Sequence, residues 1–359
     1  MKDKKQIQPI FKGLMAVLLI ILGIFIGIAI AKNSNSDSTE DSQNPGATTQ
    51  GTQGVEGTDN PDGTQEADKQ VEVPSTQIEQ EAEKATGEET FVIFGVDSRT
   101  NQLGKGTRSD SIMIVHVNHE NKTVKVASVF RDCMVHIDGR SKFEKITHAH
   151  SYGGPELALS TINENFDLKA SNYITVNFNS VAKLVDMIDG IDYEITEDEC
   201  KHMGSRFTQP GKYHLNGTEV VTYSRIRKAP GGDYKRSERQ RDMLFEIFEK
   251  SKTLSTMERV NLVDKMIGDI KTNYKKDEII KILYYLSKYK ITGMDAFPKT
   301  FYGGTVEGAW VEVPVTLVDM NAALHKFLFG TTDYVPSEKV KEYSDTLRGK
   351  VSGANTTLK

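Results

Sequence analysis

The stretch from Asp110 to Val129 reads DSIMIVHVNHENKTVKVASV, and it decides the fold predicted for this chain. Two apolar-rich runs, 110–118 and 123–129, stand on either side of a polar turn at 119–122. Runs rich in β-branched residues around a short polar turn predict a β-hairpin. The preceding run TFVIFGV at 90–96 is almost wholly apolar and predicts a further, buried strand.

Outward from the hairpin, strand-like and helix-like segments alternate along the chain. Strands are expected at 173–178 and 191–195, with shorter apolar pieces near 293–297 and 310–315. Helices are expected at 155–166, 179–188, 216–223, 237–252, 256–269, 276–288 and 317–329. Pro155 suits the first turn of its helix, where a missing N–H costs nothing. The interleaving predicts a layered α/β or α+β domain.

The composition is typical of a globular protein with a weak negative charge. The 359 residues carry a formal net charge of −5, with 37% apolar and 26% charged residues. Two cysteines, Cys133 and Cys200, are too few for a disulfide framework, and two separate buried thiols are the simpler alternative to a bridge. The sequence has no CxxC, HExxH or zinc-spaced His/Cys cluster, which argues against a soft-metal site.

The first 88 residues divide into three parts by composition. A lysine-rich tail at 1–12 precedes GLMAVLLIILGIFIGIAIA at 13–31, an uncharged run long enough for one transmembrane helix. Lysines before this run and acidic residues after it predict a single-pass protein with a cytoplasmic N-terminus. The alternative is a cleaved signal peptide, but the run is longer than a usual signal core. Residues 32–88 predict a flexible extracytoplasmic linker before a domain at 89–350.

Charged motifs follow or open several predicted strands. Asp97-Ser-Arg99 follows the first strand, Arg108-Ser-Asp110 opens the second, and Arg131-Asp132 follows the hairpin. Each alone has an ordinary explanation as a turn residue, helix cap or surface ion pair. Together they supply carboxylates for a hard metal and arginines for phosphate oxygens. Their repetition therefore predicts a site for Mg²⁺-assisted phosphoryl transfer.

A fourth segment, 223–240, gathers basic residues around a Pro-Gly-Gly turn at 230–232. Arg225 and Arg227 are two residues apart, so an extended backbone would point both to one side. Residues spaced by three and four share one helix face, which here groups Arg236, Arg239 and Gln240. Asp233 stands just before the expected helix and is a candidate for its cap. The turn allows the two groups of side chains to converge.

These motifs resemble the LytR-CpsA-Psr family of cell-envelope enzymes. The resemblance covers about 90–252 and includes, in the family's order, Gly95-Val-Asp97-Ser-Arg99, Arg108-Ser-Asp110, Arg131-Asp132, Tyr152-Gly-Gly154-Pro-Glu156, Leu215-Asn-Gly217, Arg225-Ile-Arg227 and Asp233-Tyr-Lys-Arg236-Ser-Glu-Arg239-Gln240. It implies an α/β fold with a mixed central sheet flanked by helices on both sides. It also implies a phosphotransferase that moves an anionic glycopolymer, such as teichoic acid or capsule, from a polyprenyl-pyrophosphate carrier to peptidoglycan.

The resemblance also implies roles for single residues. Asp97 and Asp110 would hold Mg²⁺ or Mn²⁺. The pyrophosphate would be surrounded by Arg99, Arg108, Arg131, Lys145, Arg225, Arg227 and Arg236. The same arginines would form the catalytic set together with Asp233 and Gln240. Phe130, Thr107 and the segment Glu144-Lys-Ile-Thr147 depart from the family's usual residues, but none removes a charge from this set.

Two other functions would use the same side chains. Water as the acceptor would make the protein a lipid-pyrophosphate hydrolase. A non-catalytic protein that binds or anchors wall polymer would need the arginines but not the two carboxylates. The expected partners are the lipid-linked polymer, peptidoglycan and the membrane. Nucleic acid is not expected, because the domain would face outward and the short cytoplasmic tail has no basic recognition helix.

Overall fold

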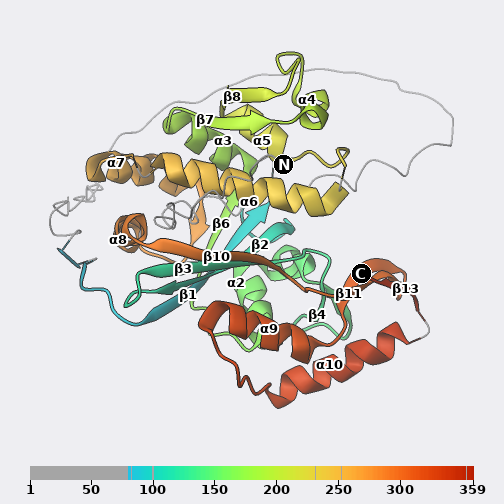
Figure 1. The fold of residues 1–359 in the computed structure, drawn as a ribbon. Coiled ribbons are helices and arrows are strands. Elements are labelled where there is room, and N and C mark those ends of the chain that lie inside the picture. Colours follow the sequence, from blue (N-terminus) through green and yellow to red (C-terminus); the bar gives the residue numbers. More distant parts are fainter. Residues whose placement is uncertain (1–79, 82, 99–100, 231, 252, 353) are drawn as a thin grey trace, which may run out of the picture. The chain divides into compact units, whose positions relative to one another are not determined.

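The computed structural model describes residues 80–81, 83–98, 101–230, 232–251, 253–352 and 354–359, and a six-stranded mixed sheet lies at its centre (Figure 1). The strands are β1 Glu88–Val96, β2 Ser109–Asn118, β3 Thr123–Val129, β6 Asn172–Asn177, β9 Lys271–Thr272 and β10 Lys290–Phe297. Their order in the sheet is β10-β3-β2-β1-β6-β9. β1 runs antiparallel to β2 and parallel to β6.

Both faces of the sheet are buried, and β1 shows why. Its side chains alternate between faces, as the strand period requires. Phe91 and Ile93 belong to one apolar core, and Val92 and Phe94 belong to another. All four side chains are fully buried. The continuous apolar run at 90–96 therefore reflects a central strand that packs against layers on both sides.

The core on the Phe91 face is closed by a helical layer. It contains α3 Phe178–Met187, α5 Gly217–Ser224, α6 Gly232–Ser251, α7 Thr256–Met266 and α8 Lys276–Lys288. A 3₁₀ turn, Ile267–Asp269, follows α7. The hairpin β7 Ile191–Ile195 and β8 Gly211–Leu215 and the helix α4 Glu197–Met203 extend this layer away from the sheet (Figure 1).

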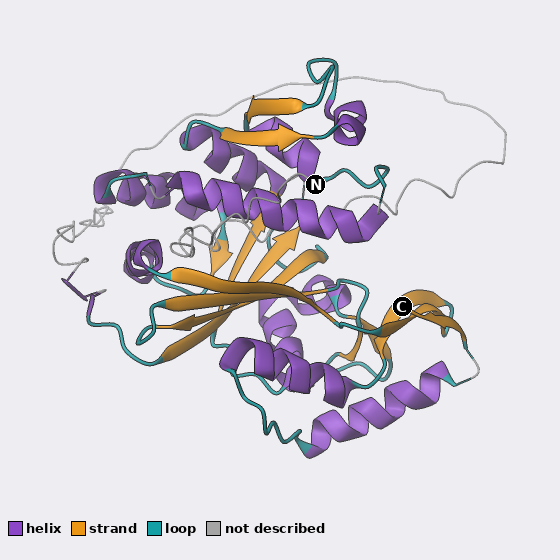
Figure 2. Cartoon of the chain, viewed as in Figure 1, coloured by secondary structure: helices purple, strands orange, loops and turns teal. Residues whose placement is uncertain are grey.

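The core on the Val92 face is closed by three helices and small sheets. The helices are α2 Thr147–Phe166, α9 Leu317–Phe329 and α10 Glu338–Val351. The sheets are formed by β4 Met134–His136 with β5 Phe143–Lys145, and by β11 Phe301–Val306, β12 Ala309–Pro314 and β13 Asn355–Leu358. Helices thus cover both faces of a mixed sheet (Figure 2), as expected from the family resemblance.

Most of the predicted elements are confirmed. The hairpin joins β2 to β3 with Asn118 paired to Thr123, so the polar turn lies where the sequence predicts it. The helices at 276–288 and 317–329 have the predicted bounds. Cys133 and Cys200 are separate buried thiols. Among the described residues, eight elements lie where no helix or strand was predicted: β4, β5, α4, β8, β9, β11, α10 and β13.

Two local predictions are wrong, and a third is incomplete. The helix expected at 155–166 is confirmed as the second part of α2, because non-helical angles at Gly154, φ 74° and ψ −167°, divide α2 just before Pro155; the first part, which begins at Thr147, was not predicted. The helix expected from residue 237 begins at Gly232, so Asp233 lies inside its first turn rather than before it. Arg225 has helical angles, φ −97° and ψ −2°, because it caps α5. An extended backbone therefore does not align it with Arg227.

The predicted tail at 1–12, the span at 13–31 and most of the linker lie outside the described residues. Among the residues that the structure does describe, no helix is long and apolar enough to cross a membrane. The transmembrane span therefore stays a prediction from the sequence.

Candidate active site

Two carboxylates meet at one end of the central pair of strands. In the antiparallel register Gly95 pairs with Ser111 and Val96 pairs with Ser109, so Asp110 is the extra residue of a β-bulge. A bulge bends its strand and redirects the side chain of the inserted residue. Asp97 directly follows β1 at this same end. The sequence motifs that follow β1 and open β2 are therefore brought together by strand pairing.

Arg131 joins this pair from the end of β3. Its Nη1 atom lies 2.6 Å from Oδ1 of Asp110, and its Nε atom lies 3.7 Å from Oδ1 of Asp132. Lys145 on β5 places Nζ 2.7 Å from the same Asp132 oxygen. Arg131, Asp110 and Asp132 are each less than a tenth exposed. Arg131 is thus held by two carboxylates, and Lys145 is close enough to share one of them.

The electrostatic surroundings of Asp110 connect the strand ends to the later Arg-rich segment. The pKa of Asp110 is raised to about 8, chiefly by burial and in smaller part by the negative charge of Asp97. The positive charges of Arg131, Arg108 and Arg227 oppose this rise. A carboxylate responds in this way only to charges that lie near it. Arg227 therefore reaches the same site from a segment about one hundred residues later in the chain.

Arg225 lies at this end of the sheet through a different contact. Its guanidinium carbon is 4.9 Å from the centre of the Phe178 ring. Phe178 begins α3 directly after β6, and the last residue of β6, Asn177, pairs with Val96. Phe178 is therefore next to the strand end that carries Asp97. Arg225 is exposed, so its cation–π contact leaves its donors accessible to an anion.

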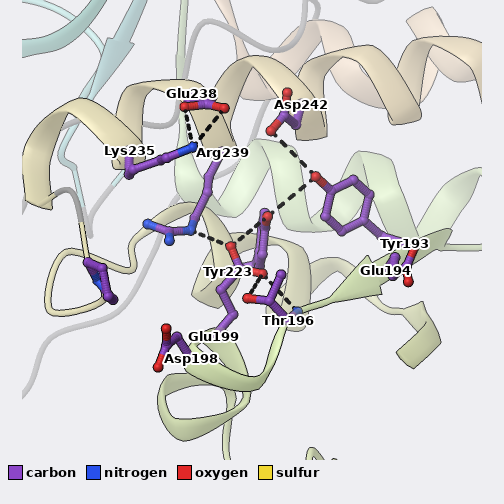
Figure 3. A pocket seen from close by; sticks show the side chains of 11 residues that line it. Tyr193, Glu194, Thr196, Asp198, Glu199, Tyr223, Lys235, Glu238, Arg239 and Asp242 are labelled. Carbon is purple, nitrogen blue, oxygen red and sulfur yellow. Dashed lines mark hydrogen bonds and ion pairs between the residues drawn. The ribbon is translucent and has the colours of Figure 1, made fainter. Parts of the chain in front are cut away.

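Three buried side chains in the first half of α6 fix the Arg-rich segment 223–240 in place. Arg236 is 2% exposed and Gln240 is fully buried. Gln240 donates a hydrogen bond from Nε2 to the Ser224 carbonyl oxygen at 3.1 Å, which fixes α6 against the end of α5. Arg239 donates from Nε to Glu199 at 2.7 Å (Figure 3). It also donates from Nη1 to the Ile226 carbonyl oxygen at 3.3 Å. Arg239 therefore has a structural partner.

His150 is a residue of the site's surroundings that the sequence prediction missed. It lies in the first half of α2, fully buried, and its Nδ1 donates to the Thr107 carbonyl oxygen at 2.8 Å. That bond ties α2 to the loop that carries Arg108, which is exposed. One turn earlier, the Thr147 amide donates to the Arg131 carbonyl oxygen at 3.2 Å. A prediction of helix from residue 147 onward would have been needed to find both contacts.

For two predicted site residues, the structure gives no side-chain position. Arg99 lies outside the described residues, and Asp233 is located only as part of the first turn of α6. No group of three or more His, Cys, Asp or Glu side chains suited to a metal occurs in the described parts of the chain. The two carboxylates Asp97 and Asp110 still suit Mg²⁺, which commonly takes one or two carboxylates, substrate phosphates and water. These two carboxylates therefore fit a metal ion that also takes phosphate oxygens of the substrate as ligands.

Comparison with known proteins agrees with this geometry. The model of the LytR_cpsA_psr family matches residues 25–321, which is most of the chain, and the protein belongs to that family. The matched range includes each of the segments that meet at the site.

Curated relatives in the family have names that describe a transfer reaction. The chain is 30% identical over 201 residues to the polyisoprenyl-teichoic acid–peptidoglycan teichoic acid transferase TagU of Bacillus cereus (strain AH820), an alignment that covers 52% of this chain and 64% of the relative. It is also 30% identical over 233 residues to the transferase TagT of Bacillus subtilis (strain 168), covering 60% and 72%. The chain thus spans just under two thirds of the first of these relatives.

Solved structures share the fold. The structure of TagT bound to LIIa-WTA superimposes with a TM-score of 0.56 at 26% identity, covering 70% of this chain and 93% of that one. A mixed α/β architecture of this kind is therefore a property of the family.

Proposed function

We propose that the protein is a phosphotransferase that attaches an anionic glycopolymer, carried on a polyprenyl pyrophosphate, to peptidoglycan. One observation carries the proposal. Arginines from strand ends and from the α5–α6 connection gather around the bulged carboxylate Asp110, with a second carboxylate, Asp97, beside it. The naming of curated relatives as teichoic acid transferases supports the same reaction for this chain.

In the proposed reaction the arginines bind the donor. Guanidinium groups donate pairs of hydrogen bonds that match the oxygens of a phosphate. Arg108 and Arg225 are exposed and Arg227 is half-buried, so these three would make the first contacts with the pyrophosphate. Arg131 is fixed between Asp110 and Asp132, and it would hold its charge in a constant position as the reaction proceeds.

The chemical step breaks the phosphoanhydride bond of the donor and forms a phosphoester bond to the acceptor. A hydroxyl oxygen of the acceptor glycan attacks the phosphorus next to the polymer and loses its proton. The bond from that phosphorus to the bridging oxygen breaks, and polyprenyl phosphate leaves. Negative charge increases on the leaving oxygen, where the nearby arginines stabilise it.

Asp97 and Asp110 are the residues that would hold a divalent metal. When bound, Mg²⁺ or Mn²⁺ would neutralise charge on phosphate oxygens. The raised pKa of Asp110 agrees with a site built for an additional positive charge, because a nearby cation favours the ionised carboxylate.

The location of the site follows from the N-terminal sequence. The proposed arrangement is a cytoplasmic tail at 1–12, a membrane span at 13–31 and a catalytic domain outside the membrane. A polar linker of about 55 residues would behave as a coil with a reach of about 40 Å. The domain would then remain near the membrane that holds its lipid-linked donor.

A turnover assay tests the proposal against its closest alternative. Purified full-length protein is given lipid-linked teichoic acid, with and without peptidoglycan glycan as acceptor. The proposal predicts covalent polymer–glycan product and little free polymer. Release of free polymer at the same rate in both reactions would show a hydrolase instead.

Binding without turnover would indicate a protein that only anchors wall polymer. The paired variants Asp97→Asn and Lys228→Ala separate these cases, because only the first removes a proposed metal ligand. A transferase should lose turnover with Asp97→Asn and retain it with Lys228→Ala. An anchoring protein should retain its affinity for wall polymer in both variants.

A further inference from the structure

A cavity of about 270 Å³ lies between α6 and the turn that joins β7 to α4 (Figure 3). This is close to the lower size limit of pockets that bind small organic ligands. Tyr193 and Glu194 approach it from β7, Asp198 from α4, Tyr223 from α5, and Glu238 and Asp242 from α6. The sequence motifs predicted none of these six side chains as functional residues.

The cavity has the opposite electrostatic character from the arginine site. Its carboxylates outnumber its cations, Lys235 and Arg239. Lys235 lies 2.9 Å from Oε2 of Glu238, and Arg239 lies 2.7 Å from Glu199, so both cations are already paired with carboxylates. An anionic polymer would be repelled here, whereas a neutral or amine-bearing ligand would not.

The side chains that line the cavity suit hydroxyl groups. Tyr193 donates to Asp242 at 3.4 Å, and Tyr223 lies 3.4 Å from the Tyr193 hydroxyl. Contacts of this length are weak, so a ligand hydroxyl can replace them at small cost. Phenols and carboxylates together supply both donors and acceptors, which is what a sugar ring with several hydroxyls requires.

The cavity and the arginine site share one chain segment. Tyr223 lines the cavity, and Arg225, two residues later, stacks on Phe178 at the sheet end. On α6, Arg239 borders the cavity while its neighbour Gln240 bonds the end of α5. A ligand in the cavity therefore contacts the same connection that positions the arginines.

We propose that this cavity is a subsite for a sugar residue of the acceptor glycan. The inference rests on the proposed transferase function, since it assigns the acceptor to one side of the α5–α6 segment and the anionic donor to the other. Charge distinguishes the two ligands: the donor binds among arginines, and the uncharged acceptor sugar binds among carboxylates and phenols.

The double variant Tyr193→Phe/Asp242→Asn tests the subsite with little change in shape. Glu246→Gln is the matched control, because Glu246 lies one turn further along α6, is also half-buried and does not line the cavity. The loss of two hydrogen bonds should raise the KM for acceptor glycan about tenfold and leave the KM for lipid-linked donor unchanged. The control should match the wild type. An unchanged KM for acceptor, or an equal rise in both KM values, would overturn the inference.

A direct binding measurement tests the subsite independently of enzyme turnover. A neutral N-acetylglucosamine tetramer is titrated into full-length protein and followed by calorimetry. The inference predicts binding to the wild type and to Glu246→Gln, and about tenfold weaker binding to the double variant. Equal affinity in all three proteins, or no binding, would overturn it. If the wild type transfers no polymer, the proposed function fails, and the tetramer affinities alone decide whether the cavity binds sugars.

Discussion

Acidification should destabilise this domain through one buried histidine, His150. The ring is fully buried, packs against Phe94 with 5.6 Å between ring centres, and donates from Nδ1 to the Thr107 carbonyl oxygen at 2.8 Å. Burial lowers the pKa of His150 from 6.5 to about 4, because the charged ring would lose its water. The folded protein therefore holds the ring neutral in a pH range where the unfolded chain would protonate it.

The sign and size of the effect follow from this difference in pKa. The stabilising contribution is fully present above about pH 6.5 and is lost as the pH falls toward 4. The full shift corresponds to about 3 kcal/mol, and about 2 kcal/mol of it should disappear between pH 7 and pH 5. Because the His150 bond holds the loop of Arg108, loosening of that loop should accompany the loss.

Urea unfolding of the full chain at pH 7 and pH 5 measures the effect, with His150→Gln as the reference. Glutamine is neutral at both pH values and offers an amide donor for the Thr107 carbonyl. The wild type should lose about 2 kcal/mol more stability than the variant on acidification. Other titrating groups cancel in the comparison. Equal losses in the two proteins would refute the proposed role of the buried ring.

Two further predictions concern packing and buried charge. Arg239→Ala should cost about 3–5 kcal/mol of unfolding free energy, because Glu199 would remain buried without its cation, whereas Lys235→Ala should cost less than about 1 kcal/mol in the same urea titration. Similar costs for these two variants would contradict a structural role for the ion pair between Arg239 and Glu199. Gly217→Ala should destabilise by about 1–3 kcal/mol, since a Cβ there would lie 2.0 Å from a backbone carbonyl oxygen. Gly268→Ala, with nothing within 4 Å of its Cβ, should change thermal stability little, and a large loss there would count against the packing argument.

Much of the central sheet could be predicted from local sequence. The hairpin at 110–129 combines two regular apolar runs with a polar turn, and both signals are local. The almost wholly apolar run at 90–96 predicts a buried strand, and the structure shows that both faces of this strand are buried. Strand pairing alone brings the ends of β1, β2 and β3 together. The predicted strands therefore also predict that Asp97, Asp110 and Arg131 lie close together.

What could not be predicted depends on contacts between distant residues. The first half of α2 begins at Thr147, whose amide bonds the Arg131 carbonyl, and no sequence pattern near 147 records that partner. Spacing groups Arg239 with Arg236 and Gln240 on one helix face, but its partner Glu199 lies 40 residues earlier in α4. The bulge that redirects Asp110 also becomes visible only when the two strands are paired.

The affinity for a short-chain polyprenyl pyrophosphate, measured by calorimetry with and without Mg²⁺, tests the central claim most directly. Full-length wild type should bind it, and Mg²⁺ should tighten binding. Arg227→Ala should weaken binding about 10- to 100-fold, the usual value of a charge-assisted contact, and the exposed neighbour variant Lys228→Ala should have a much smaller effect. Affinity that is independent of Mg²⁺ and the same in both variants would contradict a pyrophosphate site formed by these carboxylates and arginines.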